Sequence, residues 1–457
     1  MKKVILVLLC LALFVPMAFA NKGKDEKIKI VLVHGYADFY QRAWTEWEAE
    51  HPEAELVWVP KGGGVVASDA LIAAKVPPNV FMATPGEVGK YLIPGFALKL
   101  DDYVDLSDFL PGSLDIYNRE GGTYAIPVTV AVNAFDINLT LAEAVGIDTS
   151  EYRNRDYLSI EEFTQFCMAI RDKAPEGYYG TAIWAGNLGS QQVNWHWLSA
   201  FGATFFENGD YSKVTINSPE AVQGMEYMKF LVDSGFAPPE APVLDDDEAI
   251  AIWASGKIGG LWARAGGWLS MIDSALSQGM SDSGERQEHV FQTWPVADGV
   301  EKNPLSYGGM AGLVIATGDE QIDALAADLL DHFTDRSAQT KTIAPGAGYV
   351  TRYSAIEPPQ DVWPEWTDVT YGPDGTGGIL GQYEAALDYD PGFKHYTRIS
   401  ELWNEYGGLD VGISTIYFEA LKQEWLKVFQ PFMTGDITAE EALSTLEREM
   451  NKILAGN

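Results

Sequence analysis

Residues 28–60 read IKIVLVHGYADFYQRAWTEWEAEHPEAELVWVP and contain a strand, a helix and a second strand in that order. The first six residues are an apolar run of strand length, and residues 38–50 repeat apolar side chains at helical spacing. Pro52 ends the helix, and residues 56–59 supply the second strand. A strand–helix–strand unit of this length implies a parallel sheet with a right-handed crossover, so we predict an α/β protein.

The same alternation continues along the chain, with a helix expected at residues 69–75 and a strand at residues 80–83. In an α/β sheet, ligands bind at the carboxyl ends of the strands, which here are the loops 34–39 and 60–68. Further strands are expected at 124–135, 258–262 and 312–316, with helices after Ser159 and a final helix whose capping box is Thr438-Ala-Glu-Glu441. This order favours a compact, two-lobed α/β body.

The N-terminus has the features of an export signal. Lys2 and Lys3 form a basic head, residues 4–15 are apolar, and Ala18-Phe-Ala20 has the small-x-small form of a cleavage site. We therefore expect cleavage after Ala20 and an exported, soluble protein. The alternative is a lipoprotein acylated at Cys10, which would leave a very short apolar region.

The composition excludes several classes of partner. A net charge of −34 repels nucleic acid and anionic lipid, so neither is expected to bind. Cleavage leaves one cysteine, Cys167, in an amphipathic helical pattern, so a disulfide scaffold is excluded and a buried thiol is expected. The 14 Trp and 21 Tyr residues suit sugar stacking, but they also suit ordinary core packing.

Most enzyme signatures are absent from the sequence. It contains no Gly-x-Ser-x-Gly elbow, no P-loop and no dinucleotide fingerprint, and its six histidines are too scattered for a zinc site. Residues 245–248, Asp-Asp-Asp-Glu, are read as a solvated helix start rather than a calcium loop. No cofactor or metal is expected. A secreted glycoside hydrolase remains the alternative, because its chemistry needs only two carboxylates.

Five segments occur in an order typical of one family. They are Pro78-Asn-Val-Phe81 with Gly95-Phe-Ala-Leu-Lys-Leu-Asp-Asp102, Gly122-Thr-Tyr-Ala-Ile-Pro127 with Asn133 to Asn138, Trp253-Ala-Ser-Gly-Lys257 with Gly266-Gly-Trp268, Gly308-Gly-Met-Ala-Gly-Leu-Val-Ile315, and Gly346-Ala-Gly-Tyr349. Together they resemble the extracellular sugar-binding proteins of ABC importers, a family that includes the maltodextrin-binding proteins. The chain departs from the family pattern at Asn79, where Asp is usual, and at Val33, where Trp or Tyr is frequent.

The resemblance implies the type II periplasmic-binding-protein fold, with two Rossmann-like lobes and a ligand cleft between them. It places residues 21–132 and 307–345 in the N-terminal lobe and residues 133–306 and 346–457 in the C-terminal lobe. It implies a monomer that captures a mono- or oligosaccharide outside the cytoplasm, closes about a hinge and delivers the sugar to the membrane permease subunits. It implies no catalysis; a peptide- or metal-binding receptor is a third option.

Four aromatic residues are candidates for stacking on a sugar. Trp268 follows two glycines after a strand and matches the family's ring-stacking Trp. Trp195 and Trp197 alternate around His196, so each is equally suited to a site or to the core. Tyr36 follows the first strand, where it takes the place of the family's aromatic residue, as Phe39 also could.

Five further candidates are polar or lie beside glycines. Tyr307 precedes Gly308 and Tyr349 follows Gly348, positions where small residues let a ring approach a ligand. Lys61, Asn133 and Arg264 offer polar groups for sugar hydroxyls. Arg264 would also suit the carboxylate of an acidic sugar or a surface ion pair, and the sequence leaves these alternatives open.

Overall fold

The chain forms two compact units. The computed structural model describes residues 27–34, 37–60, 66–92, 95–109, 113–207, 211–264, 275, 279–280, 284, 287–301, 303–335, 351–352, 398, 401–402, 405–409, 415 and 417–456. Unit 1 contains the described residues up to Thr129, between Met310 and Lys341, and between Val350 and Pro358. Unit 2 contains those between Val130 and Gly309 and from Pro359 onward.

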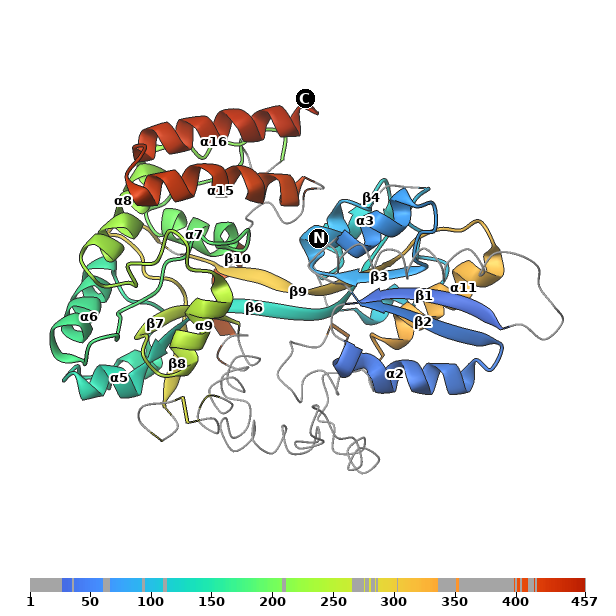
Figure 1. The fold of residues 1–457 in the computed structure, drawn as a ribbon, viewed down its shortest axis with the longest axis horizontal. Coiled ribbons are helices and arrows are strands. Elements are labelled where there is room, and N and C mark those ends of the chain that lie inside the picture. The colour runs from blue at the N-terminus through green and yellow to red at the C-terminus, as the bar shows by residue number, and fades with distance from the viewer. Residues whose placement is uncertain are drawn as a thin grey trace, which may run out of the picture. The chain divides into compact units, whose positions relative to one another are not determined.

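The strands of unit 1 form the sheet predicted from the first sixty residues. β1 (Ile28–His34) pairs in parallel with β2 (Ala54–Pro60) and with β3 (Val80–Ala83). α2 (Ala37–Glu50) connects β1 and β2 (Figure 1). The sheet continues from β3 to β9 (Leu305–Val314), which runs antiparallel to it. The α/β class is therefore confirmed.

Both faces of this sheet are buried, as the alternation of side chains along a strand requires. In β3, Val80 and Met82 belong to one apolar cluster, whereas Phe81 and Ala83 belong to another. The first cluster includes α11 (Glu320–His332), and the indole nitrogen of Trp47 in α2 donates to a carboxylate oxygen of Asp328 at 2.7 Å. The second cluster includes residues of α3 (Val66–Ala73) and α4 (Pro85–Gly89).

A buried arginine ties a late segment of the chain to unit 1. Arg352 is 6% exposed, and its guanidinium lies 4.3 Å from the ring centre of Phe109. Its Nε donates to the hydroxyl of Thr334 at 3.1 Å, and its Nη2 contacts a carboxylate oxygen of Asp331. Because a buried guanidinium needs such partners, these contacts hold residues 351–352 beside α11.

The strands of unit 2 are mainly antiparallel. β6 (Ile126–Asn138) pairs with β7 (Gly260–Arg264) and with β8 (His289–Gln292), and β10 (Gly408–Leu409) pairs in parallel with β9. Both β6 and β9 begin in one unit and end in the other, since the unit boundaries fall after Thr129 and Gly309. Two continuous strands therefore contribute residues to each unit.

The described part of unit 2 also contains several helices. They are α5 (Leu139–Ala144), α6 (Ile160–Lys173), α7 (Ser190–Ser199), α8 (Pro219–Asp233), α9 (Asp246–Ala254), α15 (Phe418–Thr434) and α16 (Ala439–Leu454). α15 and α16 lie side by side (Figure 1). The capping box at Thr438 and Glu441 is present, and Asp245 and Glu248 form another at the start of α9, as the helix interpretation of residues 245–248 predicted.

Short elements complete the described chain. They are the 3-10 turns Leu106–Asp108, Asp115–Tyr117 and Tyr152–Asn154, and the two-stranded ribbon of β4 (Asn118–Arg119) and β5 (Gly122–Thr123).

The core of unit 2 contains polar residues among its aromatic rings. Cys167 is fully buried, as predicted, and burial raises the pKa of its thiol. Asp136 is fully buried and accepts hydrogen bonds from the indole of Trp253, at 2.7 Å, and from Nδ1 of His289, at 2.7 Å. These bonds connect β6, β8 and α9, and they compensate for the cost of burying a carboxylate.

His196 lies in the middle of α7 and stacks on Trp294, with ring centres 3.8 Å apart. It is fully buried, and desolvation by burial lowers the pKa of its imidazole to about 3. The ring is therefore uncharged at any pH at which the protein is expected to work.

We predict that this histidine makes unit 2 sensitive to acid. The unfolded chain protonates His196 below its ordinary pKa of 6.5, whereas the folded chain does so only near 3. Stability is therefore lost as the pH falls through this window, by about 2 kcal/mol between pH 6.5 and pH 5. Urea unfolding at both pH values should show that His196→Phe loses less stability on acidification than the wild type. Equal losses in the two proteins would contradict the prediction.

Candidate functional site

Three of the predicted site residues lie on adjacent strands of unit 2. Asn133 in β6 is the register partner of Arg264, the last residue of β7. Its amide nitrogen donates to the hydroxyl of Ser306, at 3.2 Å, and Tyr307 follows Ser306 in β9. Asn133 is 4% exposed, and its amide oxygen has no hydrogen-bond partner among the described residues. Because burying an unpaired acceptor is costly, this oxygen is available for a ligand hydroxyl.

The two alternating tryptophans belong to the core of unit 2. Trp195 is fully buried, with its ring 4.5 Å from that of Phe205 and 6.3 Å from that of Trp425. Trp197 is 1% exposed and packs against Phe135 and Phe163. Both rings are enclosed by other aromatic side chains, and we therefore leave them out of the proposed site.

For the remaining candidates the structure gives no side-chain position. Tyr36, Lys61, Trp268 and Tyr349 lie outside the described residues. Arg264 and Tyr307 are placed by their strands alone.

A second group of polar residues, missed in the sequence, lies where α7 begins. Gly186, Asn187, Leu188 and Gly189 precede the helix and are partly exposed. Gly189 caps α7 without a side-chain hydrogen bond. Ser190, the first helical residue, is fully buried, and within the described part of the chain its hydroxyl has no partner. The backbone N–H of Ser190 donates to the carbonyl of Asn187, at 3.3 Å, so the group that this start of the helix offers to a ligand is the hydroxyl.

Gly186 holds this loop close to the segment before α9. Its backbone N–H donates to the carbonyl of Leu244, at 2.8 Å. A Cβ atom at position 186 would lie 2.6 Å from that carbonyl oxygen and still closer to the carbonyl of Val243. Only glycine permits this approach, so residue 186 fixes where Asn187 stands.

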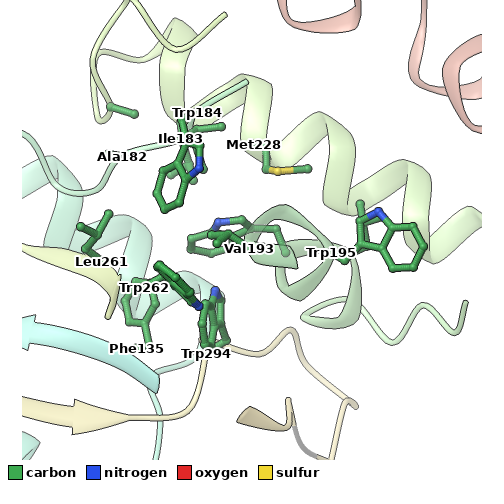
Figure 2. Packing of buried hydrophobic residues seen from close by; sticks show 14 of the residues in the cluster. Phe135, Ala182, Ile183, Trp184, Val193, Trp195, Met228, Leu261, Trp262 and Trp294 are labelled. Atoms are coloured by element: carbon green, nitrogen blue, oxygen red, sulfur yellow. The ribbon is translucent and has the colours of Figure 1, made fainter. Parts of the chain in front are cut away.

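Aromatic rings connect the two groups. Trp184 precedes the loop, and its ring centre lies 6.1 Å from that of Trp262, which pairs in register with Phe135 across β7 and β6. Figure 2 shows Trp184, Trp262 and Trp294 gathered beside Phe135 and Val193. Trp184 is 1% exposed, and no described residue accepts a hydrogen bond from its indole nitrogen. We call Asn133, Trp184, Asn187, Ser190 and Trp262 the polar–aromatic cluster.

Unit 1 has a comparable helix start after the predicted ligand-facing loop 60–68. Ser68 lies in the first turn of α3 and is fully buried, and its hydroxyl is unpartnered among the residues described. The next residue, Asp69, accepts hydrogen bonds from Lys90, at 2.8 Å, and from Tyr91, at 2.6 Å. Burial by itself would raise the pKa of Asp69, but these bonds outweigh it and lower the pKa. The carboxylate of Asp69 therefore already has hydrogen-bond partners within the protein, Lys90 and Tyr91.

Metal binding and membrane insertion find no support in the described residues. No group of three or more His, Cys, Asp or Glu side chains in this part of the chain could hold a metal ion. None of the described helices combines the length and the apolar character needed to cross a membrane.

The sequence does contain a signal for the polar residues at the start of α7. Gly186-Asn-Leu-Gly189 stands between an extended segment and a helix, and glycines flanking an amide residue at such a junction are typical of a ligand-binding loop. The burial of Ser190 and Trp184 is not visible in the sequence.

Comparison with known proteins shows one consistent similarity. The model of the family described as bacterial extracellular solute-binding protein matches residues 34–340. The maltotriose-binding protein of Pyrococcus abyssi is 23% identical over 344 residues, which cover 72% of this chain and 67% of that one.

Solved structures share the fold at low sequence identity. The maltose-bound MalE3 of T. maritima has a TM-score of 0.72 and 15% identity, covering 93% of this chain and 99% of that one. UgpB of Mycobacterium tuberculosis, in complex with glycerophosphocholine, has a TM-score of 0.71 and 14% identity, covering 95% and 99%. A substrate-binding protein of Listeria monocytogenes, in complex with cycloalternan, has a TM-score of 0.69 and 16% identity, covering 94% and 99%. The predicted type II fold is thus confirmed.

Proposed function

Because the chain belongs to the bacterial extracellular solute-binding protein family, we propose that its solute is a carbohydrate, which it captures outside the cytoplasm for an ABC importer. The polar–aromatic cluster of unit 2 carries this proposal. It combines amide, hydroxyl and indole groups that have no hydrogen-bond partner among the described residues with the neighbouring rings of Trp184 and Trp262. Sugars present the complementary pattern, because hydroxyl groups ring an apolar C–H face.

The relatives support a sugar without defining which one. The P. abyssi relative is named for maltotriose, and structures of the same fold hold maltose and cycloalternan. Another structure of this fold holds glycerophosphocholine, so the fold alone does not determine the solute. The choice of a sugar therefore rests on the side chains of the cluster.

The remaining parts of the proposal follow from the sequence. We propose that the leader is cleaved after Ala20 and that the mature protein acts as a monomer in the periplasm or an equivalent compartment, with the permease subunits as its partners. It would bind and release its sugar unchanged. The alternative, a secreted glycoside hydrolase, draws no support from the matched family.

We also propose that the sugar contacts both lobes, assigned to residues 21–132 with 307–345 and 133–306 with 346–457. The sugar then stabilises a closed form, because only that form lets both lobes contribute contacts. Small-angle scattering at saturating sugar should show a smaller radius of gyration than without sugar. Superimposable curves would rule out hinge closure.

The cluster can be tested by removing single hydrogen-bonding groups. A thermal-shift screen of neutral mono- and oligosaccharides first identifies a ligand, since ~100 times the dissociation constant adds ~2.7 kcal/mol of stability. We then expect Ser190→Ala and Trp184→Phe each to weaken binding by about 1 kcal/mol in calorimetric titration, because each removes one hydrogen bond.

Trp425→Phe is the matched control for Trp184→Phe. Its indole is also fully buried and lacks a hydrogen-bond partner among the described residues, but it packs in the core beside Trp195 and Phe429. The control should bind sugar as the wild type does. If all three variants bind normally, the cluster is not the site.

Trp268 remains the proposed stacking residue. In the sequence, two glycines precede it shortly after β7, which ends at Arg264, and a large ring beside small residues suits a sugar face. Trp268→Ala should weaken binding by ~2 kcal/mol or more and have less effect on melting. If Trp268 were a core residue, its replacement by alanine would instead lower the stability by ~3–5 kcal/mol. Titration and melting of this one variant distinguish the two roles.

A further inference from the structure

We propose that Asp246 makes the site selective for uncharged sugars over acidic ones, by occupying the helix end at which a ligand carboxylate would bind. The inference rests on the proposed function and answers what the sequence left open, whether the solute carries a charge. Asp246 is the first residue of α9 and is partly buried.

Asp246 contacts the loop before α7 directly. One of its carboxylate oxygens accepts a hydrogen bond from the side-chain amide of Asn187. The other lies beside Gly189, since a Cβ atom built there would be 3.5 Å from it. The carboxylate therefore stands next to Gly189, the N-cap of α7, and the N-terminus of a helix carries partial positive charge.

A helix start of this kind ordinarily attracts anions, and a ligand carboxylate or phosphate is a frequent occupant. Here the protein supplies its own carboxylate. Neither a Lys nor an Arg side chain forms an ion pair with Asp246 in the part of the chain that the structure describes. Because no described cation neutralises it, the charge of the Asp246 carboxylate would act on a ligand that approaches the loop before α7.

Neighbouring residues add to this negative potential. Asp245 caps α9, and Asp247 and Glu248 follow Asp246, so four carboxyl groups share one helix start. Asp246 raises the pKa of the Asp247 carboxyl, with burial and Asp245 contributing in the same direction. An anionic ligand would meet the same repulsion, whereas a hydroxyl group could hydrogen-bond to Asp246 or to the unpaired oxygen of Asn187.

The unpaired groups of the cluster agree with an uncharged ligand. Ser190, Trp184 and Asn133 are all neutral, and each can exchange a hydrogen bond with a hydroxyl group. Sites that bind carboxylates typically aim Arg or Lys side chains at them.

The test compares matched neutral and acidic sugars by calorimetric titration. The pairs are D-glucose with D-glucuronate, D-galactose with D-galacturonate, and cellobiose with cellobiouronate. We expect the wild type to bind a neutral member at least about tenfold more tightly than its acidic partner at low salt. The ratio should shrink at 1 M NaCl, where charges are screened within about 3 Å.

Asp246→Asn should reduce this ratio by about tenfold, because it keeps the shape of the side chain and removes its charge. Asp247→Asn is the matched control, since it removes the same charge from the adjacent, exposed residue. The control should leave most of the discrimination in place. Melting curves verify that both variants fold.

The possible results separate the two proposals. A wild type that binds an acidic sugar as tightly as its neutral partner would overturn the role of Asp246 and leave a sugar receptor in place. An unchanged ratio in Asp246→Asn, or an equal change in Asp247→Asn, would do the same. A wild type that binds no sugar of either kind, in this set or in the wider screen, would overturn the proposed function itself.

Discussion

The burial of α7 on almost every side is the constraint on which the rest of unit 2 depends. A helix in this position cannot turn its polar side chains to water, so each must find a partner inside the protein. Asn194 donates to the carbonyl of Trp184 at 3.0 Å, and His196 stacks on Trp294. Other polar atoms of the helix and the loop before it have no partner among the described residues, and those of Asn187 and Ser190 lie where the helix begins. The same buried helix therefore contributes to the core and begins at the proposed site.

The elements that depend on local pattern could be predicted from the sequence. β3 has the expected bounds, Val80–Ala83, because it is a short apolar run closed by turn residues. The capping boxes at Thr438 and Asp245 follow from one residue and its neighbour three positions later. Such signals involve few residues and do not require knowledge of the tertiary structure.

The site depended on features that a linear pattern does not contain. The alternation of Trp195 and Trp197 would separate two rings on a half-buried element, but on a helix enclosed all round both rings are buried. Asn133, Arg264 and Ser306 meet only because of the register of β6, β7 and β9, which is set by the whole sheet. The role of Asp246 depends on the close approach at Gly186, which joins two segments far apart in the chain.

The route of the chain through unit 1 also governs the order in which the protein can form. β3 needs residues 311–314 as its neighbour, and Phe109 needs Arg352. A ribosome has thus produced the long first segment of unit 2, residues 130–309, before the last pieces of unit 1 exist. Pairings between such distant segments form slowly, because the entropy cost of closing a long loop comes before the stabilising contacts are made. During synthesis the N-terminal segments of unit 1 therefore remain incompletely folded. In that interval a chaperone or a translocation channel can bind them as an extended chain.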